Sequence, residues 1–140
     1  MDIEISELPK NPYSFGVIVR FLSMHKPFSE FEFGSMSKSI LFQIQNDSHL
    51  VAIKDDQVIG YLGWLRTTEE IARAWQDENT PLRPAENPTA LAVTIFAVSE
   101  QSFIRPIIRY AKKREPGLTV FWKRYYQDGR EPKRKVVEVE

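Results

Sequence analysis

Residues 89–98, TALAVTIFAV, form the most apolar stretch of the chain and decide the fold that the sequence predicts. A strand that is covered on both faces shows such a continuous apolar run, so this segment is expected in the middle of a sheet. Thr94 is the one hydroxyl at its centre. It is either a β-branched strand residue whose hydroxyl is satisfied locally, or the occupant of a catalytic position.

The composition of the 140-residue chain is that of one globular domain. With 42% hydrophobic and 27% charged residues, the chain is neither disordered nor membrane-spanning. The acidic start, MDIEISELPK, lacks the basic and apolar regions of a signal peptide, so a cytoplasmic protein is predicted. We expect residues 1–12 to form an N-terminal arm and residues 13–140 to form a single domain.

Several kinds of chemistry are excluded by residue content. The chain has no cysteine, which removes disulfides, thiolate nucleophiles and cysteine-bound zinc. Its two histidines, His25 and His49, are too few for a histidine-based metal site. No metal-ligand spacing, P-loop or nucleophile elbow occurs, so the motifs indicate no cofactor. We expect His49 to pair locally with Asp47.

Apolar periodicity predicts an α/β layered domain with a mixed, mostly antiparallel sheet flanked by helices. The second helix has an apolar stripe on one side, made of Phe33, Met36, Ile40, Leu41 and Ile44. The predicted helices cover residues 13–24, 33–45, 69–76 and about 106–115. The predicted strands fall within residues 49–66, 89–98, 118–126 and 135–140.

Local signals support two of these boundaries. Asp55-Asp56-Gln57 separates two β-rich segments, which predicts a hairpin turn although it contains no glycine. Thr67 and Glu70 have the spacing of a capping box, which predicts the start of the third helix.

Four stretches carry a resemblance to a known family: FGVIVRFLSMHKPF, HLVAIKDDQVIGYLGWLRTTEE, ALAVTIFAVSEQ and REPGLTVFWKRYYQDGREPKRKVVEV. Their order and spacing resemble the GNAT type of acetyltransferase. More specifically, they resemble the toxin-activating lysine acyltransferases, which fatty-acylate RTX haemolysins inside the producing cell. The resemblance covers roughly residues 13–140. It implies a GNAT-like fold in which splayed central strands form the cleft for the acyl group.

In that family, catalysis is assigned to a histidine just after the first helix and to an aspartate on the long strand. The resemblance puts Phe28 at the histidine position and Thr94 at the aspartate position. Neither residue can replace the original, since phenylalanine has no exchangeable proton and the threonine hydroxyl stays neutral. The resemblance also implies that Phe28, Ala97 and Ser99 line the substrate-binding side of the cleft.

His25 is the candidate base that remains. It lies three residues before Phe28, about one helical turn away, so continuation of the helix could aim its ring into the same cleft. One of three acids would then replace the missing aspartate: Glu30, Glu32 or Glu100. The alternative is that His25 is a surface or helix-capping group.

The acyl donor is expected to be acyl carrier protein. Enzymes that use coenzyme A usually hold its pyrophosphate on a glycine-rich loop that opens the helix after the long strand. The matching segment here, VSEQSFIRP, has no glycine and contains Glu100. The resemblance implies transfer from acyl carrier protein to a protein lysine. This acidic partner would suit the basic residues of the helix, Arg105, Arg109, Lys112, Lys113 and Arg114.

Two other functions remain open. Residues 104–135 carry eleven Lys and Arg against three acids, and FWKRYYQDGREPKRK mixes aromatic with basic side chains, as a nucleic-acid-binding module does. Alternation along a strand gives the same pattern without any ligand. The other possibility is a catalytically silent relative that binds a protein, with a homodimer formed through the apolar hairpin near Tyr61 and Trp64.

Overall fold

The computed structural model describes residues 3–124 and 133–138, and the side chains of residues 3–122. The described strands form one sheet in the order β1-β2-β3-β4-β5-β6. Only β4 and β5 are parallel, and the other neighbours are antiparallel. The predicted mixed, mostly antiparallel sheet is confirmed. The strands are β1 Glu4–Ser6, β2 His49–Lys54, β3 Gln57–Thr67, β4 Ala90–Val98, β5 Thr119–Arg124 and β6 Lys133–Glu138.

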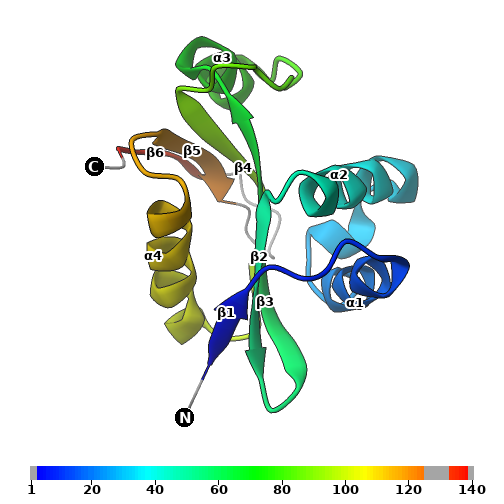
Figure 1. Ribbon diagram of the computed structural model, residues 1–140. Helices are drawn as coiled ribbons and strands as arrows, with labels where there is room; N and C mark the ends of the chain where they lie inside the picture. The colour runs from blue at the N-terminus through cyan, green and yellow to red at the C-terminus, as the bar shows by residue number, and fades with distance from the viewer. Residues whose placement is uncertain (1–2, 125–132, 139–140) are drawn as a thin grey trace.

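Helices cover both faces of this sheet. In Figure 1, α1 and α2 lie on one side of β2 and β3, and α4 lies on the other. The helix α3 packs on β4 and β5 through Ala72, Ala90 and Phe121. Among the described residues, no helix is long and apolar enough to span a membrane. The helices are α1 Pro12–Leu22, α2 Phe33–Gln45, α3 Glu69–Glu78 and α4 Ile104–Arg114, with single 3-10 turns η1 Phe28–Glu30 and η2 Gln101–Phe103.

The N-terminal segment is not simply an arm. Its residues Glu4 to Ser6 form β1, which pairs with β2 in the register Glu4↔Ile53 to Ser6↔Val51. Asn11 then caps α1, because its side chain accepts a hydrogen bond from the backbone N–H of Ser14 at 2.9 Å. The segment predicted as an arm over residues 1–12 thus contains β1, the edge strand of the sheet.

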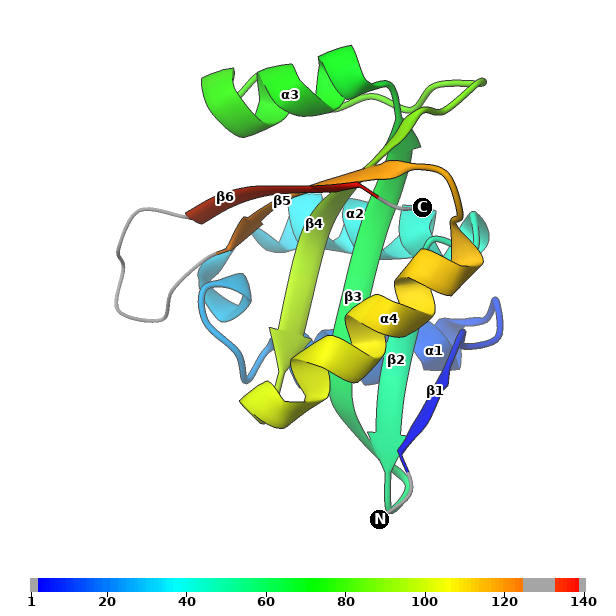
Figure 2. The ribbon, with the colours of Figure 1, turned by 90° about the vertical axis from the view of Figure 1, so that its left-hand side faces the viewer.

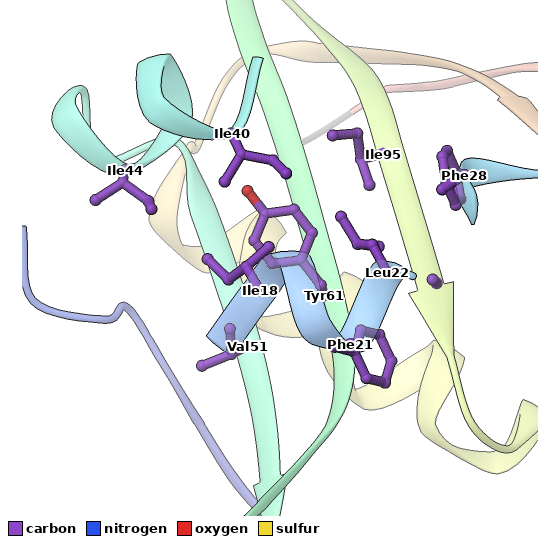
Figure 3. Packing of buried hydrophobic residues seen from close by; sticks show 10 residues of the cluster. Ile18, Phe21, Leu22, Phe28, Ile40, Ile44, Val51, Tyr61 and Ile95 are labelled. Carbon is purple, nitrogen blue, oxygen red and sulfur yellow. The ribbon is translucent and has the colours of Figure 1, made fainter. Parts of the chain in front are cut away.

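The hydrophobic core has two main layers, one on each face of the sheet. Figure 3 shows the layer beneath α1 and α2, where Tyr61 lies among aliphatic side chains from both helices. The layer beneath α4 contains Leu91, Val93 and Ile107. Because β4 contributes to both layers, the prediction that residues 89–98 form a central strand covered on both faces is confirmed.

Burial corrects two expectations about surfaces. Phe33 and Leu41 were placed on the core stripe of α2, but 66% and 42% of their surface is exposed. Ile40 and Ile44 carry that stripe instead. The hairpin face proposed for a homodimer is not available, because helices cover it. The sequence alone does not show which neighbours cover a strand. Tyr61 and Trp64 are at most 1% exposed, beneath helices on opposite faces of the sheet.

The hairpin turn is confirmed and the capping box is not. Asp55 and Asp56 have φ angles of 52° and 62°, the left-handed conformation that a two-residue hairpin loop requires and that aspartate tolerates. The N-cap of α3 is Thr68, whose hydroxyl accepts from the Ile71 N–H at 3.2 Å. Thr67 is the last residue of β3, and its hydroxyl donates to the Arg83 carbonyl at 2.8 Å.

Candidate functional site

Thr94 is the extra residue of a β-bulge. Along the β3–β4 pair, Gly63 lies opposite Ile95 and Trp64 lies opposite Val93, so Thr94 has no partner on β3. A bulge bends the strand and re-aims the side chains around it, and bulges occur frequently beside active sites. This position could not be recognised from the apolar pattern alone.

The bulge lies where β4 leaves β5. The parallel ladder runs from Ala90↔Thr119 to Val93↔Trp122, and the described residues form no further pair between these two strands. Because β4 continues to Val98, its last five residues have no strand neighbour on that side within the described part of the chain. Figure 2 shows the two strands diverging, as the resemblance implies. We call this region, residues 94–98 of β4 and the end of β5, the fork.

A buried amide connects Thr94 to the core. Gln43 of α2 donates from Nε2 to the Thr94 hydroxyl at 2.8 Å and accepts at Oε1 from the Tyr61 hydroxyl at 2.5 Å. Gln43 is 3% exposed and Tyr61 is fully buried, which raises the pKa of Tyr61 far above its ordinary value. Tyr61 therefore stays a neutral donor. Thr94 accepts from Gln43 and retains its own proton for donation.

Gly63 makes this network possible. A Cβ at this position would clash with Oε1 of Gln43. A glycine is therefore needed for the amide to lie over β3 and reach Thr94 on β4. The sequence analysis missed Gln43 and Gly63. The available signal was the glycine inside a β-rich run, which marks a close approach of another group to the strand.

His49 extends the polar cluster on the other side of Gln43. Its Nε2 accepts from the Leu8 N–H at 2.9 Å, which assigns the proton to Nδ1, 3.4 Å from the Gln43 carbonyl. Burial lowers the pKa of His49 below 6.5, so the ring is neutral. The described residues show no hydrogen bond between His49 and Asp47, whose carboxylate lies 3.2 Å from the Lys10 amine and acts on the ring through its charge alone. A long-range contact with the N-terminal segment replaces the local pair.

The positions matched to the family's catalytic pair lie on two elements, Thr94 on β4 and Phe28 in the turn η1. Phe28 is 6% exposed and packs in one cluster with Ala97 and with Ile95, the residue that follows Thr94. Figure 3 shows Phe28 and Ile95. Ser99, at the end of the strand, donates its hydroxyl to the Ile59 carbonyl at 3.2 Å. An aromatic ring and a hydroxyl at these positions can orient a ligand but cannot accept a proton near neutral pH.

His25 lies just beyond the end of α1. Its Nδ1 is 2.8 Å from the Phe21 carbonyl, and its ring packs on the Phe21 ring with centroids 4.2 Å apart. A carbonyl only accepts, so Nδ1 carries the proton and Nε2 carries the lone pair. This is the tautomer that a general base at Nε2 requires.

The three acids considered as partners of His25 have other surroundings. Glu30 lies 3.4 Å from the Lys26 amine, and Glu32 accepts from the Ser35 hydroxyl at 3.1 Å. Glu100 is exposed at the connection that follows β4. The described residues thus give His25 a backbone carbonyl as its hydrogen-bond partner.

The connection from β4 to α4 offers few donors to an anion. It forms the turn η2, in which the Phe103 N–H donates to the Glu100 carbonyl at 3.1 Å. Pro106, in the first turn of α4, has no N–H. Both features remove backbone donors from this helix start, where a pyrophosphate would need a row of free N–H groups.

The basic side of α4 is open in part. Arg105, Arg109 and Lys113 are exposed, whereas Lys112 is half-buried. Arg114 forms an ion pair with Glu7, so one of the five predicted partner-binding residues is already engaged. In the segment proposed to bind nucleic acid, Trp122 is half-buried against the α4 layer. The side chains after it lie outside the described residues.

One hollow of the described surface lies away from these positions. It has a volume of about 530 Å³ and separates α1 from the β2–β3 turn. None of the predicted site residues lines it. Its walls are Tyr13, Gly16, Val17, Arg20, Phe21, Met24, Gln57 and Val58.

Solved structures with the same arrangement include proteins of the GNAT type. An acetyltransferase of the GNAT family from Streptococcus agalactiae matches with a TM-score of 0.64 and 14% identity, over 90% of this chain and 78% of that chain. This chain has the GNAT fold. No family model and no curated protein matches its sequence.

Two other GNAT-fold matches have a TM-score of 0.65. They are the loading GNAT-like domain of CurA from Lyngbya majuscula, 8% identical, and the GphF GNAT-like decarboxylase in complex with isobutyryl-CoA, 11% identical. Each match covers 88% of this chain, which spans 65% of the length of either protein.

Proposed function

We propose that this chain is an acyltransferase of the toxin-activating type, which takes an acyl group from acyl carrier protein and transfers it to a lysine of a partner protein. The observation that carries the proposal is the fork, with Thr94 at its apex. Beyond Val93, the edge of β4 presents backbone N–H and C=O groups that have no strand partner among residues 3–124 and 133–138. Such groups require hydrogen bonds, and the amide and thioester groups of a pantetheine arm can supply them.

The comparisons support a thioester ligand of this kind. GphF, which shares the fold, was solved with an acyl thioester, isobutyryl-CoA, and the CurA domain is described as a loading domain. At 8% and 11% identity, the likeness shows that the fold is shared, and the ligand of this chain is part of the proposal.

Acyl carrier protein fits this chain better than free coenzyme A. Carrier protein presents its thioester on a pantetheine arm without the nucleotide, so no pyrophosphate needs to be held beside Glu100. The exposed cations Arg105, Arg109 and Lys113 would face the acidic carrier surface. A cytoplasmic location is part of the same proposal.

His25 is the base in this proposal. Its Nε2 would take the proton from the lysine amine as the amine attacks the thioester carbonyl, and the thiol of the carrier would leave. Support comes from the tautomer fixed by the Phe21 carbonyl and from the position of His25 three residues before the buried Phe28.

The test is transfer of a labelled acyl group from acyl carrier protein to candidate partner proteins. We expect His25→Ala and His25→Asn both to lower the transfer rate by about 100-fold, the contribution typical of a general base. The asparagine variant is the control, since its amide can still donate to the Phe21 carbonyl but cannot accept the lysine proton. A normal rate in His25→Asn would assign His25 a structural role only.

The second candidate is a catalytically silent relative that binds an acylated carrier. It is favoured by Phe28 and Thr94, which leave the fork without a proton acceptor of its own. A stable complex with acyl carrier protein, with no transfer to any lysine and no effect of His25→Asn, would establish this function instead.

A further inference from the structure

One buried hydrogen-bond donor near the fork has no partner among the described residues. The indole Nε1 of Trp122 is buried and makes no hydrogen bond with the part of the chain that the structure describes. An unsatisfied buried N–H is costly, and each such group in a folded protein calls for a specific reason. The neighbouring core tryptophan, Trp64, does have a partner, since its Nε1 donates to Glu115 at 3.3 Å.

Trp122 occupies a particular place in the sheet. On β5 it forms the last rung of the ladder, opposite Val93. Its ring nevertheless stacks on Phe96, three residues further along β4, with centroids 6.2 Å apart and planes 18° apart. The ring therefore extends past the last rung and covers the α4 side of the fork.

The surroundings of the ring are mostly apolar. Trp122 lines a cavity of about 20 Å³ between α4 and the sheet, together with Val93, Ile108 and the stem of Lys112. A trapped water needs several polar partners, which walls of this kind do not provide. The carbonyl oxygen of an entering ligand would suit this N–H better.

We propose that Trp122 is a ligand-binding residue whose indole N–H donates to a carbonyl oxygen of an acyl-pantetheine arm lying in the fork. This inference rests on the proposed function and names the side chain that recognises the arm. The ring of Trp122 stacks on Phe96 with or without the ligand, while its N–H gains a partner only when the arm is bound.

The test compares two identical substitutions, Trp122→Phe and Trp64→Phe, with octanoyl-pantetheine as the probe. Phenylalanine keeps an aromatic ring at position 122 for the contact with Phe96 and removes the N–H. We expect calorimetry to give about five- to tenfold weaker binding for Trp122→Phe, the value of one neutral hydrogen bond, with a smaller loss of thermal stability than Trp64→Phe, because Trp122 is only partly buried. Trp64→Phe should bind normally and unfold at a temperature a few degrees lower, because it loses a satisfied hydrogen bond.

A second measurement does not depend on affinity. The chain has three tryptophans, so its indole ¹H–¹⁵N resonances can be assigned from the substituted proteins. On addition of octanoyl-pantetheine, the Trp122 proton should move downfield as it gains an acceptor, and the Trp64 proton should stay in place.

Two results would overturn the inference. If the unsubstituted protein and Trp122→Phe bind the probe equally and the Trp122 resonance is unmoved, the indole is only a core residue, and the proposed function is unaffected. If the unsubstituted protein does not bind the probe, the inference also fails, and the transfer assay with acyl carrier protein then decides the proposed function separately.

Discussion

Gly63 has no side chain, and the Gln43 amide lies in the space that a side chain would fill as it reaches Thr94. The Gln43 amide is buried and holds both the Tyr61 hydroxyl and the Thr94 hydroxyl. A network with every member satisfied is stable, whereas loss of one member leaves buried polar groups without partners. The site around the bulge thus depends on a residue that has no side chain.

Gly63→Ala should therefore destabilise the protein. The added Cβ would displace the Gln43 amide and leave the buried Tyr61 hydroxyl unsatisfied, which costs about 1–3 kcal/mol. Urea unfolding measures this loss. In a Gln43→Ala background the same change should cost much less, because nothing is then displaced. Equal costs in the two backgrounds would contradict the clash with Gln43.

His49 should make stability depend on pH. Its pKa in the folded protein is below the unfolded value of 6.5, so below that pH the unfolded chain binds a proton that the folded chain does not. The free energy of unfolding should be largest above pH 6.5 and fall as the pH drops, by at most about 1.4 kcal/mol per pH unit from this group.

Urea unfolding between pH 7.5 and 5.5 tests this, with His49→Gln as the reference. Glutamine can accept from the Leu8 N–H but does not titrate, so its stability should fall less over the same range. Identical pH profiles for the two proteins would show that His49 is not the group responsible.

Among the elements, α1 contains a glycine that packing does not require. Gly16 is exposed on this helix, and a Cβ added there would have no atom within 4 Å. Glycine inside a helix costs about 0.5–1 kcal/mol relative to alanine.

Gly16→Ala should accordingly raise the free energy of unfolding by about 0.5–1 kcal/mol. It is the counterpart of Gly63→Ala, since the same methyl group is added in open space on one element and into a buried amide on another. Denaturant unfolding of both variants should give shifts of opposite sign. A loss of stability in Gly16→Ala would mean that α1 packs differently around this residue.

In the molecule as a whole, the helices on the two faces of the sheet differ in the number of their exposed cations. The helix α4 lies on the opposite face from α1 and α2 (Figure 1) and carries Arg105, Arg109, Lys113 and Arg114, whereas α1 and α2 carry Arg20 and Lys38. A charged carrier protein would be steered by this difference, since charges on the rim of an interface act mainly on association and are screened by salt.

Reversing charge on α4 should weaken binding of acyl carrier protein. The double variant Arg105→Glu and Arg109→Glu should lose at least about tenfold in affinity at low salt, because the two cations are replaced by two anions. The matched control is Arg20→Glu with Lys38→Glu, the same change at exposed positions of α1 and α2. Calorimetry compares the two variants, and equal affinities would exclude α4 as the docking face.

Local patterns in the chain specify most of its elements. The apolar run over residues 89–98 requires a covered strand, and Asp55-Asp56 tolerates the left-handed turn that closes a hairpin. These features depend on near neighbours, so they can be read without coordinates. Local patterns did not bring Phe28 and Thr94 together. The family resemblance alone predicted that they belong to one site.

The site itself arises from contacts between distant segments. Whether Thr94 pairs or bulges depends on the register of β3, and the partner of its hydroxyl comes from α2, 51 residues earlier. His49 is buried because β1 returns to the sheet and Leu8 donates to its ring. Register and burial are set by the packing of the whole chain, which local periodicity does not encode.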